Sequence, residues 1–182
     1  MLFRVLVVGR STMWGFPHIF FQPRMSFDDL IDPVRQQVAE LGFELVDLRR
    51  SGPTVSPQLQ VRIDRPDSSP GHGVTAEDCV RVSRALERFL EADRAVGPRY
   101  VLQVSSPGLE RPVRWPEHWR RFIGERVRIK GSFSARSPAT IVDVPDEEHV
   151  QLRFADGVEE RIPLSAVKEA TLVYEWPEKK KP

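Results

Sequence analysis

The pattern of hydrophobic and polar residues over 25–106 predicts two helices and three strands. Apolar residues recur every three or four positions in 30–41 and again in 79–90, as on the buried face of a helix. Three apolar or alternating segments predict strands, at 43–48, 59–64 and 100–104. The order helix, strand, strand, helix, strand predicts an α/β sandwich with both helices on one face of a sheet.

Polar residues at the helix ends support these boundaries. Ser26 with Asp29, and Thr75 with Asp78, have the three-residue spacing of a capping box, in which each side chain satisfies a backbone N–H of its partner. Gly42 follows the first apolar stripe directly, where helices often end in a residue with positive φ. The first helix is therefore expected to end before Gly42, and the second to begin after Thr75.

Beyond residue 123 the pattern changes to short strands alone. Five such segments fall within 124–177, and Asp156-Gly157 is typical of a tight hairpin turn. This succession predicts a small β-barrel of the SH3 or Sm type, so the chain as a whole is expected to be α+β. The last strand is expected to carry three alternating residues, Leu172, Tyr174 and Trp176.

Residues 107–123, between the two regions, are interpreted as a junction and linker. Within it, 117–123 is expected to form one or two helical turns that direct Trp119 and Phe122 inward. Residues 178–182 form a basic tail with three consecutive lysines.

Residues 1–24 share none of these patterns. Their apolar run, 2–8, is short and is interrupted by Arg4, so it does not resemble a signal peptide. Met25 offers an alternative start. The preferred interpretation is an N-terminal extension outside the fold, with the start codon assigned too far upstream; an added edge strand is the alternative.

Charge and composition narrow the function only slightly. The chain has 27 basic and 26 acidic residues, so a nucleic-acid surface would have to be a local patch. Arginine dominates the basic residues, which suits bidentate contacts with phosphate or carboxylate, although a GC-rich genome gives the same bias. The one cysteine, Cys79, lies on the second apolar helix stripe and is interpreted as a buried hydrophobic residue.

Neither a catalytic centre nor a cofactor site is predicted. Ser105 and Ser106 lie where a strand passes into a turn, but the Gly-x-Ser-x-Gly motif is absent and no histidine has a spacing that suggests a base. The four histidines are isolated from other metal ligands. No segment approaches the roughly 20 apolar residues that cross a bilayer.

Two groups of basic residues could form binding surfaces. Arg81, Arg84 and Arg88 share one face of the second helix, where Glu77 and Glu91 could instead make them an ordinary salt-bridged surface. On the first strand beyond residue 123, basic and apolar residues alternate, which places all the basic side chains on one side. These residues are Arg126, Arg128 and Lys130, and a solvated outer face is the alternative.

The segment from Val104 to Pro112 is rich in turn-forming residues. Pro107-Gly108 suits the central positions of a type II turn, where glycine adopts a positive φ without penalty. We interpret this segment as a stiff, exposed loop that fixes how one region leaves the other. Its candidate binding residues are Ser105, Ser106, Pro107, Gly108 and Arg111.

This segment, VSSPGLERP, resembles the signature of the ribosome maturation factor P (RimP) family. The resemblance continues, in family order, through LGFELVDL at 41–48, LQVRID at 59–64, GVTAEDCVRVSRAL at 73–86 and GERVRIK at 124–130. The departures preserve size or polarity: Gln103, Glu110 and Val113 stand where glutamate, aspartate and leucine are usual.

The resemblance implies a non-catalytic, cytoplasmic protein needed for late maturation of the small (30S) ribosomal subunit. It implies an α/β N-terminal domain at 25–106, an SH3-like C-terminal barrel and no cofactor. It also implies contact with the decoding-centre protein of that subunit, number twelve, and leaves direct contact with 16S rRNA open. We expect a monomer with no membrane partner and no small-molecule substrate.

Two other functions fit parts of the sequence. A general RNA-binding module of the Sm-like class would need a continuous basic surface and would bind naked RNA. An enzyme would have to use Ser105 or Ser106, for which the sequence provides no partner base.

Overall fold

The computed structural model describes residues 4–10, 26–53, 56–69, 72–92, 96, 99–133 and 137–174. The chain divides into two compact units, Met1–Pro107 and Gly108–Pro182. The basic tail at 178–182 lies outside the described residues.

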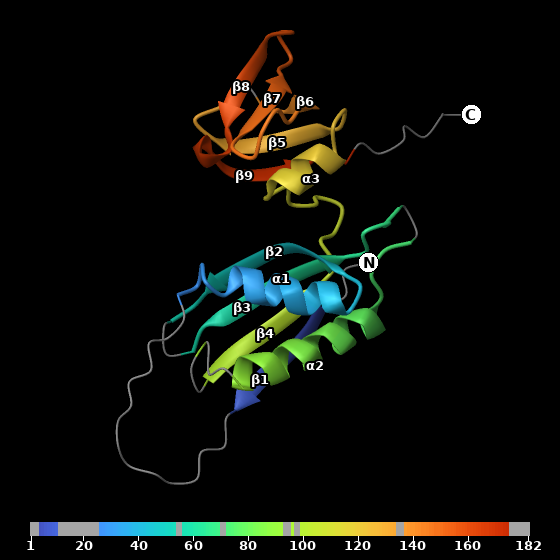
Figure 1. Cartoon of the computed structure of the whole chain (residues 1–182), viewed down its shortest axis with the longest axis vertical. Helices are drawn as coiled ribbons and strands as arrows, with labels where there is room; N and C mark the ends of the chain where they lie inside the picture. The colour runs from blue at the N-terminus through green and yellow to red at the C-terminus, as the bar shows by residue number, and fades with distance from the viewer. Residues whose placement is uncertain are drawn as a thin grey trace, which may run out of the picture. The chain divides into compact units, whose positions relative to one another are not determined.

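The first unit is a four-stranded sheet with two helices. Its elements are β1 (Arg4–Arg10), α1 (Ile31–Glu40), β2 (Glu44–Ser51), β3 (Gln58–Asp64), α2 (Ala76–Ala92) and β4 (Arg99–Ser105). The strand order is β1-β4-β3-β2, in which β3 and β4 are parallel and the outer pairs are antiparallel. Both helices lie on the same side of the sheet (Figure 1), so the predicted arrangement from α1 to β4 is present.

The core of this unit lies between the sheet and the two helices. Alternate residues of β3, including Val61 and Ile63, are buried with Leu102 of β4. The predicted stripe of α2 is buried above them, and Cys79 on it is fully buried. Burial, aided by the neighbouring Asp78 carboxylate, raises the pKa of the Cys79 thiol to about 11. The thiol therefore stays protonated and acts as a small hydrophobic side chain, as predicted.

Hydrogen bonds at the start of α2 explain where this helix begins. The Thr75 N–H donates to Asp78 Oδ2 at 3.0 Å, and the Asp78 N–H donates to Thr75 Oγ1 at 3.2 Å. This reciprocal pair is the predicted capping box, and it satisfies two backbone groups that a helix end leaves unpaired. At the end of α1, Gly42 has the predicted positive φ, +83°.

Residues 4–10 form a strand, contrary to the preferred interpretation of 1–24 as an extension outside the fold. β1 pairs with β4 along its whole length, from Arg4 opposite Ser105 to Arg10 opposite Arg99. The structure thus has the edge strand that the sequence allows as the alternative. The segment is rich in valine, which favours strands, and its pairing covers an edge of β4 that would otherwise be open. Met25 lies outside the described residues.

The described residues of the second unit form a five-stranded antiparallel sheet, one short α-helix and one 3-10 helix. Its elements are α3 (Pro116–Arg121), β5 (Arg126–Gly131), β6 (Ala139–Asp143), β7 (His149–Arg153), β8 (Glu159–Pro163), the 3-10 helix η2 (Leu164–Ala166) and β9 (Val167–Leu172). The strand order is β8-β7-β6-β5-β9. Among the described residues no pairing joins β8 to β9, so these strands are not closed into the predicted barrel. Tyr174 lies beyond β9, contrary to prediction, and Trp176 lies outside the described residues.

Most of the predicted linker is part of the second unit. Trp119 of α3 and Val113 are buried in the core beneath the sheet, as predicted for Trp119, and Phe122 packs against that core while staying partly exposed. The Leu172 N–H donates to the Arg111 carbonyl at 2.9 Å, which adds 111–113 alongside β9. The interpretation of 107–123 as a linker is therefore corrected from Arg111 onward. The physical reason is that burial of the apolar side chains of Val113 and Trp119 against the sheet is favourable.

Within the described parts of the chain, no helix combines the length and hydropathy that a membrane span requires. The same parts contain no group of three or more histidine, cysteine, aspartate or glutamate side chains that could hold a metal ion.

Candidate binding surfaces

The junction segment begins at the end of β4 and continues through the division between the two units. Ser105 is the last residue of β4 and is 4% exposed, whereas Ser106 and Pro107 are half-buried. Gly108 has φ +76°, which confirms the positive φ expected from the Pro107-Gly108 pair. Ser106 and Pro107 are therefore partly accessible to a partner, whereas Ser105 is not.

Arg111, the other junction candidate, is buried rather than displayed. It is 5% exposed, and its guanidinium carbon lies 5.3 Å from the centre of the Phe122 ring. Its backbone carbonyl accepts the hydrogen bond from β9. Arg111 thus holds the start of the second unit in place and has little surface to offer a partner.

Neighbouring in the chain, Leu109 and Glu110 are the exposed residues of this segment. Leu109 is 56% exposed, and the Glu110 side chain is 68% exposed. Neither residue is among the binding candidates predicted from the sequence. An apolar residue such as Leu109 is usually expected to be buried.

The basic strand array, defined as Arg126, Arg128 and Lys130 of β5, has the predicted one-sided arrangement. All three side chains are exposed, while the intervening Val127 and Ile129 are buried. Side-chain alternation along a strand gives this arrangement directly.

Carboxylates from other segments accompany this array. Arg128 Nη1 lies 3.1 Å from Glu110 Oε1, and Lys130 Nζ lies 2.7 Å from Glu169 Oε2 on β9. All four side chains are substantially exposed, so each pair contributes at most about 1 kcal/mol to stability. The carboxylates do, however, reduce the positive potential that a phosphate would meet.

The helix array, defined as Arg81, Arg84 and Arg88 of α2, divides into two kinds of residue. Arg81 Nη2 donates to the Leu41 carbonyl at 3.0 Å, and its guanidinium carbon lies 4.9 Å from the centre of the Phe43 ring. Arg81 therefore ties α2 to the end of α1, where a positive charge also complements the helix dipole.

Arg84 and Arg88 have no such structural contact. Both are exposed, and neither forms an ion pair with another described residue. The pairings with Glu77 and Glu91 that the sequence suggested are not formed among these residues. Arg84 and Arg88 are consequently the accessible part of the helix array.

Comparison with known families identifies the first unit. Residues 33–110 match the model of the RimP N-terminal domain, from within α1 to the junction segment. The first unit thus carries a RimP N-terminal domain. This result confirms the resemblance drawn from the junction and helix motifs, and it indicates a role in ribosome maturation with a ribosome-related partner.

The RimP N-terminal domain match includes the helix array and the junction loop through Glu110. The basic strand array and α3 lie beyond the matched residues.

A further group of side chains around α3 was missed in the sequence. The guanidinium carbon of Arg114 lies 5.6 Å from the Trp115 ring centre, and that of Arg121 lies 5.4 Å from the Phe122 ring centre. Both arginines are exposed, and both rings are partly exposed. These residues belong to RPVRWPEHWRRF at 111–122, within the segment that the sequence predicts to be a junction and linker.

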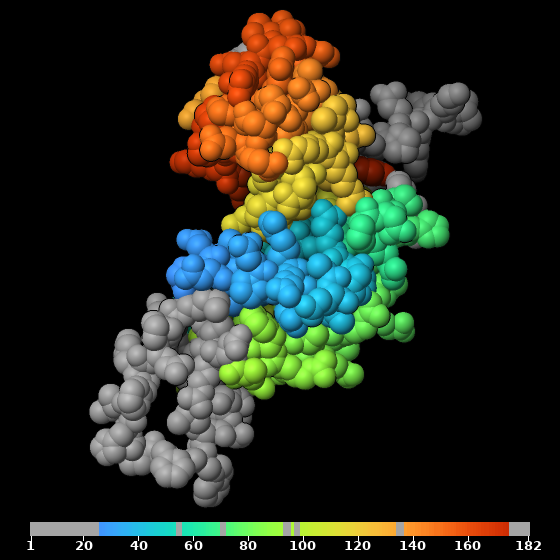
Figure 2. Space-filling view, in the orientation of Figure 1, coloured from blue at the N-terminus to red at the C-terminus, as the bar shows by residue number. Residues whose placement is uncertain are grey.

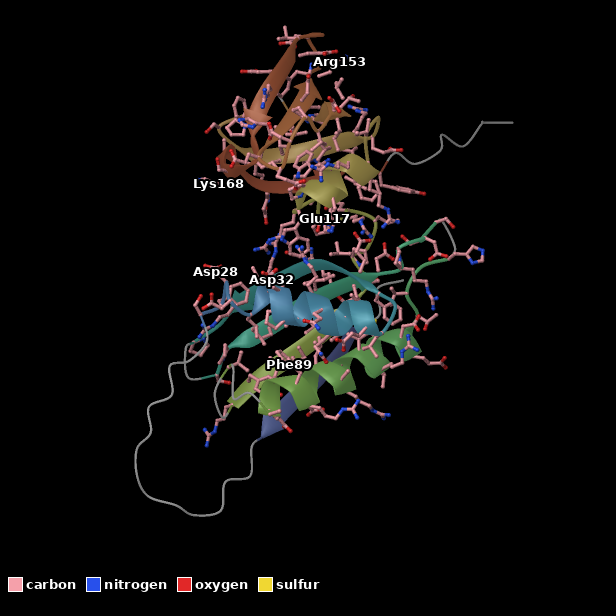
Figure 3. The ribbon with its side chains drawn as sticks, viewed as in Figure 1. Asp28, Asp32, Phe89, Glu117, Arg153 and Lys168 are labelled. Carbon is pink, nitrogen blue, oxygen red and sulfur yellow. The ribbon has the colours of Figure 1, made fainter. Side chains whose placement is uncertain are left out.

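Ion pairs also fix the hairpin region of the second unit. Arg153 of β7, labelled in Figure 3, contacts Glu159 of β8 at 2.6 Å and lowers the pKa of that carboxyl, together with Gln151. Nearby, a backbone N–H bond from Glu148 and a hydrogen bond with His149 lower the pKa of Asp146 to about 2. These charges are satisfied within the hairpins, so Arg153 is a suitable control position for the arrays.

Proposed function

We propose that this chain is a non-catalytic assembly factor for maturation of the small (30S) ribosomal subunit in the cytoplasm. It binds the maturing subunit through the decoding-centre protein number twelve and through 16S rRNA. The observation that carries this proposal is the RimP N-terminal domain match over residues 33–110, which ends inside the VSSPGLERP segment.

The junction loop and the basic strand array are the proposed contact surfaces. Ser106 and Pro107 offer accessible backbone and side-chain groups, and the positive φ of Gly108 fixes their presentation. Ser105 and Arg111 support this loop from buried positions. The strand array supplies long basic side chains that suit phosphate oxygens or an acidic protein surface.

Two buried groups favour binding over catalysis. The Ser105 side chain is too buried to serve as a displayed nucleophile, and the raised pKa of Cys79 keeps its thiol protonated near neutral pH. A binding role needs neither group to react.

We also propose that the second unit is an SH3-like barrel left open between β8 and β9. The support is a five-stranded antiparallel sheet that shares one core with α3. Such small sheets commonly present loops and one outer face to a partner.

Co-sedimentation with purified small subunits and their precursors tests the proposed function. The chain is expected to sediment with the precursors, and a deletion strain is expected to accumulate immature small subunits. Failure to associate with precursor particles would contradict the proposal. A general RNA-binding module would instead bind naked RNA as tightly as the particle and would leave subunit maturation intact.

Charge reversal of the strand array is the sharper version of this test. Arg128→Glu with Lys130→Glu is expected to weaken subunit binding by about tenfold or more at low salt, and to lower its salt dependence, because phosphate contacts are lost. Arg153→Glu is the matched control, since Arg153 is an exposed, ion-paired strand cation on β7. Equal binding by the array variant and the wild type would remove β5 from the interface.

The Gly108 backbone gives an independent test of the junction loop. Gly108→Val is expected to perturb the loop at a cost of about 1–2 kcal/mol, because valine strongly disfavours the positive φ. Gly108→Asn is the control, since asparagine tolerates that conformation. Reduced subunit binding and complementation are expected for valine only; equal behaviour of both variants would show that the loop shape is unimportant.

A further inference from the structure

We propose that the segment around α3 carries a contact site for single-stranded RNA, formed by Arg114, Trp115, Arg121 and Phe122. These four residues are called the α3 patch. The proposal deepens the proposed function, because it assigns particular side chains to an RNA contact of the assembly factor.

The α3 patch joins partly exposed aromatic rings to exposed guanidinium groups. Arg114 stacks near Trp115 at 5.6 Å, and Arg121 stacks near Phe122 at 5.4 Å. Unpaired bases stack on aromatic rings and on arginine planes, while guanidinium N–H groups bind phosphate oxygens. The patch therefore offers both kinds of contact that an RNA strand requires.

Contacts with the core of the second unit hold the α3 patch in place. Trp119, one turn along α3, is 1% exposed and anchors the helix in the core of the second unit. Buried Arg111 approaches the Phe122 ring at 5.3 Å, and the Trp115 and His118 rings meet edge to face with centres 5.0 Å apart. These contacts limit ring motion before RNA binds, which reduces the ordering cost of association.

The segment around α3 is rich in arginine, whose guanidinium group suits phosphate oxygens. Four arginines fall within 111–122, and Glu117, labelled on α3 in Figure 3, is the one acidic residue there. Arg120 forms an ion pair with Glu147 at 2.6 Å and contacts no aromatic ring among the described residues, so it is left out of the patch. The segment around α3 reaches the visible surface of the second unit, in yellow in Figure 2.

The contrast with β5 supports this assignment. Arg128 and Lys130 of the strand array contact no aromatic ring among the described residues, whereas Arg114 and Arg121 each lie beside one. The strand array suits phosphate contacts alone, whereas the α3 patch can also stack bases.

Binding of a labelled single-stranded oligouridine to the full chain tests the patch. Arg114→Ala with Arg121→Ala is expected to weaken binding about tenfold and to lower the salt dependence, because two phosphate contacts are lost. Trp115→Leu is expected to weaken binding about tenfold through lost base stacking, whereas Trp115→Phe is expected to retain most of it. Arg153→Ala is the control for general charge, and unchanged thermal unfolding confirms that each variant is folded.

The outcomes separate this inference from the proposed function. Unchanged oligouridine binding by both patch variants, or an equal loss in Arg153→Ala, would overturn the RNA contact. Loss of binding to purified ribosomal protein twelve with RNA binding intact would also overturn it, by assigning the patch to a protein. If the patch variants lose RNA while the wild type never joins precursor particles, the RNA contact stands and the assembly role fails.

Discussion

The helix array and the strand array carry the same sequence signal but have different surroundings. Each has three basic residues at the period of its element, on α2 and on β5. On α2 one cation, Arg81, is used in packing, and the other two have no ion pair with a described residue. On β5 the cations are all exposed, but Arg128 and Lys130 each face a carboxylate.

This difference shows what a periodic array of cations can and cannot indicate. The period fixes which face of the element the side chains share. Whether a cation can reach a partner depends on groups from other elements, such as the Leu41 carbonyl for Arg81 and Glu169 for Lys130. Two accessible arginines on a helix and two ion-paired cations on a strand can therefore show the same pattern in the sequence.

The largest expected effect concerns Arg81. Arg81→Ala should destabilise the first unit by about 1–2 kcal/mol, because an exposed hydrogen bond to Leu41 is lost along with stacking on Phe43. Arg88→Ala, seven positions along the same face, should change the free energy of unfolding by less than about 0.5 kcal/mol. Urea unfolding of both variants measures the difference. Equal effects would mean that Arg81 is an ordinary surface residue.

The start of α2 gives a smaller, pH-dependent effect. Burial acts against ionisation of Asp78, but hydrogen bonds from Thr75 and Arg65 outweigh it and hold the pKa of this carboxyl below 3.8. A carboxyl with a lowered folded pKa stabilises the fold above its unfolded pKa, and this contribution is lost as the pH falls through the folded value. The helix that carries the array should therefore become less stable in acid.

Asp78→Asn tests this expectation. Near neutral pH the variant should be less stable by about 0.5–2 kcal/mol, the usual value of a capping interaction. Urea unfolding at about pH 6 and about pH 3 should show that the gap to the wild type narrows in acid, because the contribution of the ionised carboxyl is progressively lost as the pH falls towards its lowered folded pKa. If the difference in unfolding free energy between the variant and the wild type is the same at both pH values, the ionised Asp78 carboxylate does not stabilise the start of α2.

Much of the fold follows from local patterns. The apolar stripe of α2, the capping box at Thr75, the alternation on β5 and the positive φ of Gly108 all depend on residues close in sequence. The junction and helix motifs were likewise sufficient to indicate the RimP family.

The features that were missed depend on distant partners. Arg81 reaches a carbonyl 40 positions away, and β1 pairs with a strand from the far end of its unit. Trp119 and Val113 pack beneath strands that follow them in the chain, so their segment appeared to be a linker. The α3 patch was overlooked for the same reason, because the sequence did not show which rings the core would leave partly exposed.

The smallest expected effect tests the carboxylates beside β5. Glu110→Gln with Glu169→Gln keeps the side-chain shapes and removes two negative charges that lie within 3.1 Å of Arg128 and Lys130. Precursor binding should strengthen by about two- to fivefold at low salt, since exposed pairs of this kind are worth less than about 1 kcal/mol. The gain should disappear at about 1 M salt, where screening acts over roughly 3 Å.

Glu159→Gln removes a comparable charge beside Arg153 and should leave binding unchanged. If it gives the same gain, the effect comes from net charge, and the β5 carboxylates have no special place at the interface.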